Sequence, residues 1–383
     1  MATSGLHASP IGDTAFRPTA VAAPAPHSPT TSRIDPAHAP AALNTQRDQQ
    51  TAASLPPQIR TKTTCLINNY NYARFVHEAV DSALAQTLPF DEIIVVDDGS
   101  TDESVQTLTR RFGDQPRVRI ISKQNGGQLS SFNEGFLRST GDILFFLDAD
   151  DIYEPAYVQS MLGLYAQRPE IDFAFCALRL FGADEGEQYR YPENTDFGYT
   201  AALTFFSMPW LGNATSCISA RRPLLSRFLP LPNTHDWRIR ADDCLVFGAG
   251  MAGGRKYFLH ECLVRYRVHG NNGFYGRGLD EVCDYPRLMT LQRLRGVLAQ
   301  RLGLRNDMVA AQIAAEFCHL PRPHWNQLRQ YSKMAGRAIP CPDVRRPTLA
   351  EMLEHFRICS RGMRSWRDEL RVLTVRLGWR SLA

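Results

Sequence analysis

Apolar runs of strand length alternate with helical repeats from residue 61 onward. Between the first two runs, and again before the fourth, apolar residues recur at helical spacing, within 72–86 and 129–137. Strands without a polar face that alternate with helices indicate a mostly parallel sheet covered on both sides. The predicted fold class is therefore α/β. The four runs lie at 63–68, 92–96, 118–121 and 143–147.

The pattern is less regular after the fourth run, where predictions rest on shorter segments. Ser100 followed by Glu103 has the form of a capping box and predicts the start of a helix after the second strand. The later segments are predicted as a strand at 171–181, a long loop at 182–215, a helix at 242–252 and two strands joined by a turn within 256–267.

Composition divides the chain into three parts. Residues 1–60 hold 9 of the 24 prolines and one aromatic side chain, Phe16, so they predict a disordered tail. Residues 61–275 hold the α/β pattern. Residues 276–383 have helical spacing and carry 19 Lys and Arg against 10 Asp and Glu, although the whole chain is only +4. That small total gives no general case for a nucleic-acid partner.

The cellular setting is predicted from two further features. No run approaches the ~18 apolar residues of a membrane-spanning helix. Nine cysteines are scattered without a C-x-x-C pair, which argues against a disulfide framework or a zinc site and favours a reducing cytoplasm.

One apolar stripe near the C-terminus has the spacing of an amphipathic helix among many arginines. Such a helix could lie on an anionic membrane, which would make the protein peripheral at the inner face of the membrane. The alternative is that the stripe packs against the α/β domain. The stripe consists of Met363, Trp366, Leu370, Leu373 and Leu377.

Two acidic clusters come directly after predicted strands. Asp97 and Asp98 follow the second run, and Asp148, Asp150 and Asp151 follow the fourth. Ligands of an open parallel sheet bind at the carboxyl ends of its strands, so these acids should converge there. Their repulsion favours a cation, and oxygen ligands suit Mg²⁺ or Mn²⁺ together with a substrate diphosphate. The alternative is that each Asp caps a helix or a turn.

Two further sites are ambiguous when taken alone. Asp242 and Asp243 open a predicted helix, where acids ordinarily complement the helix dipole. His269 follows a strand-like segment, and a lone histidine is more often a surface or core residue than a ligand.

Taken together, these motifs resemble the family 2 glycosyltransferases, which have the GT-A fold. The resemblance is close over about 61–160 and looser to about 275. It implies an inverting transferase that uses a nucleotide sugar, with a UDP-linked sugar as the first choice, and a divalent metal. The motifs are Cys65–Tyr72, Asp81–Thr87, Val96–Asp102, Asn125–Gly127, Asn133 with Gly135, Gly141–Asp142 and Leu147–Asp151.

The resemblance assigns roles to the strand ends. It implies that Asn68, Tyr70 and Asp98 hold the nucleobase, with Asp97 beside them. The D-x-D motif of the family falls on Asp148 and Asp150, which implies contacts to the ribose and to the metal.

The later motifs follow in the same way. Asp242 matches the general base of the family, with Asp243 as its rival. His269 closes a Tyr-Arg-x-His element and is implied as a metal or diphosphate contact. We expect Asp151 to cap the following helix. Candidate cations for the leaving diphosphate are Arg221, Arg222, Arg265 and Arg267.

Departures from the family pattern narrow the kind of transfer reaction that we expect. The Gln-x-x-Arg-Trp signature of processive synthases is absent, and Phe132 stands where many relatives carry a basic residue. The missing synthase signature, together with the lack of a predicted membrane-spanning helix, indicates transfer of a single sugar to a glycan, lipid-linked or protein acceptor. We expect 189–212 to cover donor and acceptor, with Trp210 or Tyr199 able to stack on a sugar.

One alternative is an inactive sugar-nucleotide-binding module. The other is a response-regulator receiver, but a receiver would need a Lys further along the chain, and none occurs between Lys123 and Lys256.

Overall fold

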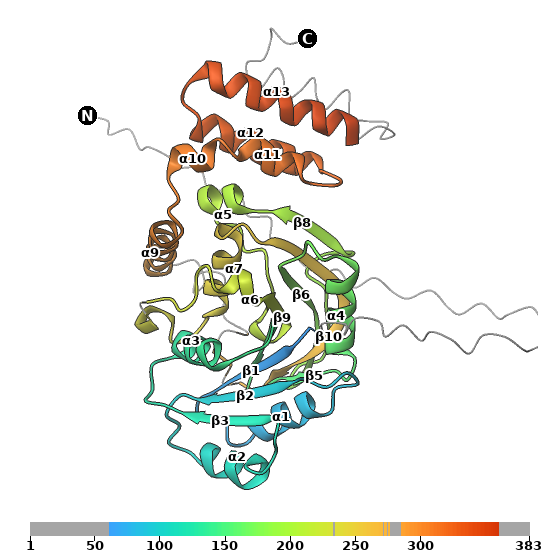
Figure 1. The fold of residues 1–383 in the computed structure, drawn as a ribbon, viewed down its shortest axis with the longest axis vertical. Coiled ribbons are helices and arrows are strands. Elements are labelled where there is room, and N and C mark those ends of the chain that lie inside the picture. Colours follow the sequence, from blue (N-terminus) through green and yellow to red (C-terminus); the bar gives the residue numbers. More distant parts are fainter. Residues whose placement is uncertain (1–60, 233, 271, 274, 276–284, 360–383) are drawn as a thin grey trace, which may run out of the picture. The chain divides into compact units, whose positions relative to one another are not determined.

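The structure is a computed structural model that describes residues 61–232, 234–270, 272–273, 275 and 285–359. The predicted tail at 1–60, the start of the C-terminal region at 276 and the apolar stripe at 363–377 lie outside these residues. Within them, one mixed sheet carries helices on both faces (Figure 1), which confirms the α/β class.

The sheet has the strand order β3-β2-β1-β4-β9-β6-β10-β5, with β7 beside β6 and β8 beside β10. The pairs β1–β2, β1–β4 and β2–β3 are parallel, whereas β9 runs antiparallel to β4 and β6. The strands are β1 (Thr63–Asn69), β2 (Glu92–Asp97), β3 (Val118–Ser122), β4 (Ile143–Asp148), β5 (Ile152–Tyr153), β6 (Phe173–Gly182), β7 (Gly186–Gln188), β8 (Thr195–Tyr199), β9 (Ile218–Arg221) and β10 (Arg255–Val268).

Alternate residues of β1 pack into two separate cores, as the pleat of a strand requires. Cys65 and Ile67 belong to the core under α1 and α4, and Leu66 belongs to the core under α3 and α7. The helices of the α/β domain are α1 (Val76–Leu84), α2 (Ser104–Phe112), α3 (Gln128–Arg138), α4 (Tyr157–Gln167), α5 (Ala201–Ser207), α6 (Arg222–Leu225) and α7 (Asp242–Met251).

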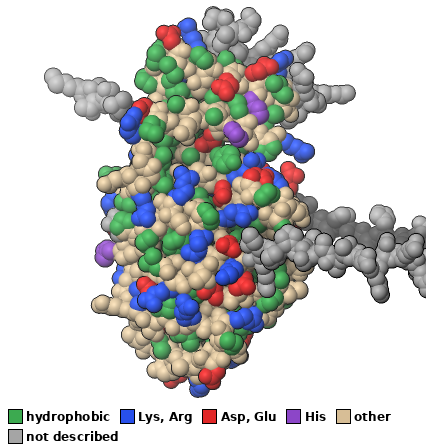
Figure 2. Space-filling view, in the orientation of Figure 1, with side chains coloured by type: hydrophobic (Ala, Val, Ile, Leu, Met, Phe, Trp, Pro, Cys, Tyr) green, Lys and Arg blue, Asp and Glu red, His purple; other side chains and the backbone are tan. Residues whose placement is uncertain are grey.

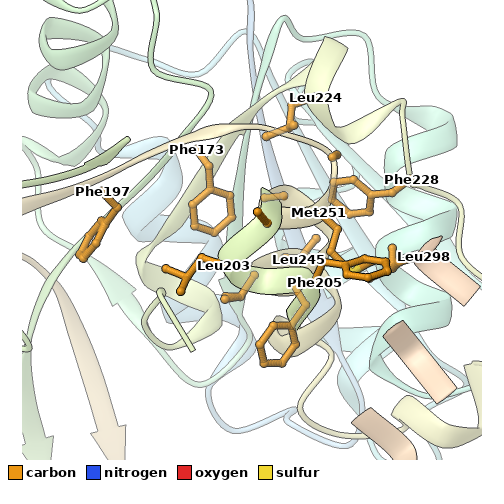
Figure 3. Packing of buried hydrophobic residues seen from close by; sticks show 14 of the residues in the cluster. Phe173, Phe197, Leu203, Phe205, Leu224, Phe228, Leu245, Met251 and Leu298 are labelled. Atoms are coloured by element: carbon orange, nitrogen blue, oxygen red, sulfur yellow. The ribbon is translucent and has the colours of Figure 1, made fainter. Parts of the chain in front are cut away.

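Helix α7 is the most deeply buried helix of the domain. Every residue from Asp243 to Met251 is buried. Around it, Phe228, Phe205 and Leu298 pack against Leu245 and Met251 (Figure 3). The start of α7 is therefore held firmly in place.

Three predictions differ from the structure, and some elements have no predicted counterpart. The segment 256–267 is one long strand, β10, with bulges between Leu259 and Val264, and it has no turn. The segment 182–215 contains β7, β8 and α5. Helix α2 begins only at Ser104, because Ser100 donates its hydroxyl to Asp97 and makes no capping box. The short antiparallel strand β9 was not predicted at all.

The C-terminal helices pack on the α/β domain through α5 and α7 (Figure 1). The buried carboxylate of Glu316 accepts hydrogen bonds from the backbone N–H groups of Ala202 (2.6 Å) and Leu203 (2.9 Å), at the start of α5. The Tyr331 hydroxyl donates to the same carboxylate at 2.8 Å. These helices are α9 (Tyr285–Leu302), α10 (Asn306–Ala310), α11 (Ile313–Cys318), α12 (Trp325–Ala338) and α13 (Pro342–Cys359).

Candidate active site

The acidic clusters meet at one edge of the sheet, as predicted. In the parallel register, Asn68 of β1 lies opposite Asp148 at the end of β4, and Asn69 lies opposite Asp97 at the end of β2. The three strands therefore end side by side. This register places the two predicted carboxylate groups at the carboxyl ends of neighbouring strands.

The side chain of Asp97 forms hydrogen bonds with neighbouring residues of the fold. Its buried carboxylate accepts hydrogen bonds from Asn69 Nδ2 (2.7 Å), from Ser100 Oγ (2.6 Å) and from the Ser100 backbone N–H (3.0 Å). These bonds fix the turn that follows β2. Asp97 thus has a structural role next to the site.

Asp98 is also surrounded by donors. Lys123 Nζ lies 2.6 Å from it, and the backbone N–H groups of Gly126 and Gly127 donate to it at 2.9 and 2.7 Å. Asn125 Nδ2 donates at 3.1 Å. A carboxylate offers about four acceptor positions, so little capacity remains for a nucleobase. The nucleobase contact stays a prediction.

The first strand end offers two other polar groups. The side-chain oxygen of Asn68 is buried and makes no hydrogen bond within the described residues. Tyr70 is exposed, at 44%. An orphaned buried acceptor is costly, and a bound ligand could satisfy it.

Asp148 sits where several groups converge. Gln128 Nε2 donates to its Oδ1 at 2.9 Å, and its own backbone N–H donates to Ser216 Oγ at 3.1 Å. Burial, and next the negative charge of Asp150, raise the pKa of Asp148 to about 7. Such crowding of carboxylates is relieved by a cation.

The second acid of the D-x-D motif faces a histidine. His269 Nε2 lies 3.0 Å from Asp150 Oδ2, and the His269 ring packs on Tyr72 and Phe75. Arg267 donates from Nε to the backbone oxygen of Asp150 at 2.8 Å. The end of β10 is thereby held against the D-x-D turn.

The donor set suits a divalent cation that completes its shell elsewhere. Within the described part of the chain, no group of three His, Cys, Asp or Glu side chains is arranged to hold a metal ion by itself. Asp150 and His269 make a two-residue set, with Asp148 two positions before. Mg²⁺ and Mn²⁺ are commonly held by one or two carboxylates plus substrate phosphates, so the residues fit such an ion.

Asp151 does not cap a helix, contrary to the prediction. Its buried carboxylate accepts from Ser216 Oγ at 2.6 Å and from the backbone N–H of Arg267 at 2.9 Å. It therefore links β10 to the segment before β9. Burial, with Asp150 and Asp148 adding to it, raises the pKa of Asp151.

The two acids at the start of α7 have different surroundings. Asp243 is buried and pairs with Arg287 of α9, while Arg240 Nε lies 3.8 Å from it. Asp242 is only partly buried. Burial raises the pKa of Asp242 to about 6, although the charges of Arg240 and Arg287 oppose the rise. The Asp242 carboxylate accepts the backbone N–H of Asp243 at 3.1 Å on Oδ1, and Oδ2 accepts no hydrogen bond within the described residues, so Asp242 is the acid with acceptor capacity to spare.

Two of the four candidate cations are in the wrong place. Arg222 donates to the backbone oxygen of Gly141 at 2.6 Å, and Arg221 donates to that of Ile171 at 2.8 Å. Gly141 precedes the amino end of β4, so Arg222 lies roughly 20 Å from Asp148 at about 3.3 Å per residue. Neither can assist a diphosphate at the strand ends.

The two remaining cations lie on β10. Arg265 and Arg267 both stack on Phe181, at 4.6 and 4.4 Å from its ring centre. Arg267 also pairs with Glu78 at 2.9 Å. Of the four candidates, Arg267 is the one that contacts the D-x-D turn within the described residues, through the backbone oxygen of Asp150.

The predicted sugar-stacking residues have other partners. Tyr199 packs edge-on against His319 of the C-terminal helices. Trp210 carries the guanidinium of Arg190 over its ring at 4.4 Å. Trp210 keeps a buried indole N–H without a partner in the described residues, whereas Tyr199 has a packing role.

The sequence profile of "Glycosyl transferase family 2" matches residues 64–263. This match covers more than half of the chain. The chain belongs to glycosyl transferase family 2. The matched segment contains the aspartates at the strand ends and at the start of α7, whereas the end of β10 and His269 lie just beyond it.

Relatives of this glycosyltransferase agree with the family. It is 33% identical over 214 residues to an uncharacterised glycosyltransferase of Nostoc sp., an alignment that spans 55% of this chain and 66% of that protein. It is also 33% identical over 137 residues to a chondroitin synthase of Pasteurella multocida, over 35% of this chain and 14% of that protein. The chain thus spans less than two thirds of either relative.

A solved structure with a related outline is that of S. aureus TarS 1–349 in complex with UDP-GlcNAc. It matches with a TM-score of 0.49 and 15% identity, over 80% of this chain and 92% of that one.

None of the described helices of the glycosyltransferase has the length and hydropathy needed to cross a bilayer. Basic, acidic and apolar side chains are mixed over the face shown in Figure 2. Gln128, which was not among the predicted site residues, is a direct neighbour of Asp148 in this glycosyltransferase. Its only signal is its place after the Asn125–Gly127 motif.

Proposed function

We propose that this glycosyltransferase moves one sugar from a nucleoside-diphosphate sugar, with UDP as the first choice, to a hydroxyl group. The observation that carries the proposal is that the side chain of Gln128 contacts both Asp148 and the backbone of Ala241, the residue before Asp242. The D-x-D carboxylates and the acid of α7 are therefore gathered around one space. A donor and an acceptor could meet there.

In the proposed complex the strand ends hold the donor. Asn68, with its unsatisfied side-chain oxygen, and the exposed Tyr70 are offered to the nucleobase. Asp98 shares this role to the extent that its bound donors allow, and Asp97 fixes the turn beside it. Asp148 meets the ribose.

Asp148, Asp150 and His269 would hold Mn²⁺ or Mg²⁺. A bound divalent ion supplies electrostatic stabilisation of the negative charge that develops on the departing diphosphate. Arg267 contacts the backbone of Asp150 and keeps this turn in place.

Asp242 is proposed as the general base for a single displacement. It accepts the proton of the acceptor hydroxyl as that oxygen forms a bond to the anomeric carbon. The bond from the anomeric carbon to the diphosphate oxygen breaks, so the configuration inverts and the diphosphate leaves with the electron pair. A base with a pKa of about 6 is mostly ionised at neutral pH and can accept a proton.

The acceptor and the setting are proposed more broadly. A glycan, a lipid-linked sugar or a protein hydroxyl could serve, and kinship with a chondroitin synthase supports a role in cell-surface polysaccharide assembly. A cytoplasmic enzyme that contacts the inner face of the membrane through 363–377 would fit such work. No nucleic-acid partner is proposed.

The decisive test is a panel of nucleotide sugars with Mn²⁺, scored by donor hydrolysis and by thermal shift. Selective hydrolysis and stabilisation by one donor would support the proposal. Stabilisation by a donor without hydrolysis or transfer to any acceptor would instead identify an inactive sugar-nucleotide-binding module.

A further inference from the structure

Two segments far apart in the sequence are joined beside the acids. The backbone N–H of Gln128 donates to the backbone oxygen of Arg238 at 3.0 Å, and Arg238 in turn donates from its guanidinium to Asn125. Gly127 has a φ of +88°, and a Cβ at this position would overlap the Arg238 backbone. The start of α3 therefore lies in tight contact with the segment that leads into α7.

The side chain of Gln128 adds a second connection. Its Nε2 donates to Asp148 Oδ1 at 2.9 Å and to Thr215 Oγ1 at 3.3 Å. Its Oε1 accepts the backbone N–H of Ala241 at 2.8 Å. One amide thus touches the end of β4 and the residue that precedes Asp242.

The chemistry of the side chain matters here. A glutamine supplies a donor and an acceptor on one rigid, neutral group. A lysine or arginine would neutralise Asp148 and offer no acceptor to Ala241, and a glutamate would place a second negative charge against Asp148. An asparagine is one methylene shorter and could not keep both contacts from the same backbone position.

We propose that Gln128 is a positioning residue, which sets the separation between Asp148 on the donor side and Asp242 on the acceptor side. This inference rests on the proposed function. Gln128 acts through its neighbours, by preventing Asp148 from rotating and by fixing the first turn of α7. A shift of about 1 Å in such geometry can cost on the order of 10²-fold in rate.

The test is a double-mutant cycle between Gln128→Met and Asp242→Asn, with kcat for sugar transfer as the readout. Met preserves the length of the side chain and removes both contacts. Gln128→Met alone should lower kcat by about 10- to 100-fold. In the Asp242→Asn background it should cost at least about threefold less, because one of the two carboxylates that it positions is already disabled. Equal losses in both backgrounds would overturn the proposal.

A matched control is Gln86→Met. Gln86 makes the same kind of two-sided bridge: its Nε2 donates to the backbone oxygen of Glu154 at 2.9 Å, and its Oε1 accepts from the Val158 N–H at 3.0 Å. This substitution should lower the melting temperature while kcat stays within about threefold of the wild type. A loss of kcat as large as that of Gln128→Met would mean that any broken bridge has this effect, and would also overturn the proposal.

Hydrogen exchange of the unliganded protein decides the matter without any activity. The Ala241 amide should exchange at least about tenfold faster in Gln128→Met and at the wild-type rate in Gln128→Glu, whose carboxylate still accepts it. Unchanged exchange in Gln128→Met would refute the bridge. If the wild type transfers no sugar, the proposed function fails while this measurement still tests Gln128.

Discussion

Asp243 is paired with Arg287, which reaches it from α9. The pair joins α7 to α9, the first described helix of the C-terminal region. It also occupies the carboxylate that competes with Asp242 for the role of base. The two neighbouring acids should therefore respond differently to the same substitution.

Asp242→Asn should lower kcat by roughly 10²–10⁴-fold, the usual contribution of a general base, and leave donor affinity unchanged. Asp243→Asn should act on folding, because it breaks the buried ion pair between Asp243 and Arg287, at a cost of about 3–5 kcal/mol. Rates of transfer, calorimetric titration with UDP and melting curves separate the two effects. A larger kcat loss in Asp243→Asn at unchanged stability would assign the base to Asp243.

Asp150→Asn should weaken binding of a UDP-sugar in Mn²⁺ by at least about tenfold, because it removes the carboxylate that faces His269. EDTA should have the same effect on the wild type. Asp343→Asn, at an exposed position of α13, is the matched control and should bind normally. Equal calorimetric affinity with and without metal would contradict the proposed ion.

Stability should depend on pH through Lys256. This lysine is buried, donates to the backbone oxygens of Val246 (2.6 Å) and Leu211 (3.3 Å), and has its pKa lowered to about 7 by burial. Between pH 7 and about 10.5 the unfolded chain holds a proton that the folded protein has lost. The free energy of unfolding should therefore rise with pH in this window.

Lys256→Met should remove that slope, whereas Lys333→Met, at an exposed position of α12, should keep it. Urea unfolding between pH 6.5 and 9 measures both. A wild-type stability that falls or stays level over this range would show that Lys256 remains charged when folded.

Residues 1–60 should be dispensable for folding and turnover, because their Ala- and Pro-rich composition offers little to bury. A chain that begins at Gln58 should keep the melting temperature and kcat of the full chain. A clear fall in melting temperature on removal of the tail would show that it packs against the enzyme.

The sequence was sufficient for those parts of the site that follow strands without a polar face. Such strands must be buried on both sides, so their ends fall on one edge, and Asp148 and Asp98 could be placed there in advance. Antiparallel β9 could not be predicted, because four residues carry no usable period. Nor could the helix α5, which lies in a segment interrupted by Pro192 and Pro209.

Hydrogen-bond partners that are far apart in the sequence could not be predicted. Asp151 reads locally as a helix cap, and its real partner, Ser216, is 65 residues away. Gln128 and Ala241 are separated by 113 residues. Hydrogen bonds between single polar groups leave no periodic trace, and only the folded sheet brings these groups together.

The Glu316 carboxylate that caps α5 limits how far the C-terminus of this enzyme can be truncated. A chain that stops before α10 would lose the acceptor for two amide groups and leave a broad apolar surface uncovered. The C-terminal helices are thus part of the same folded unit as the α/β domain, and we expect the shortest stable fragment to extend at least to the end of α13.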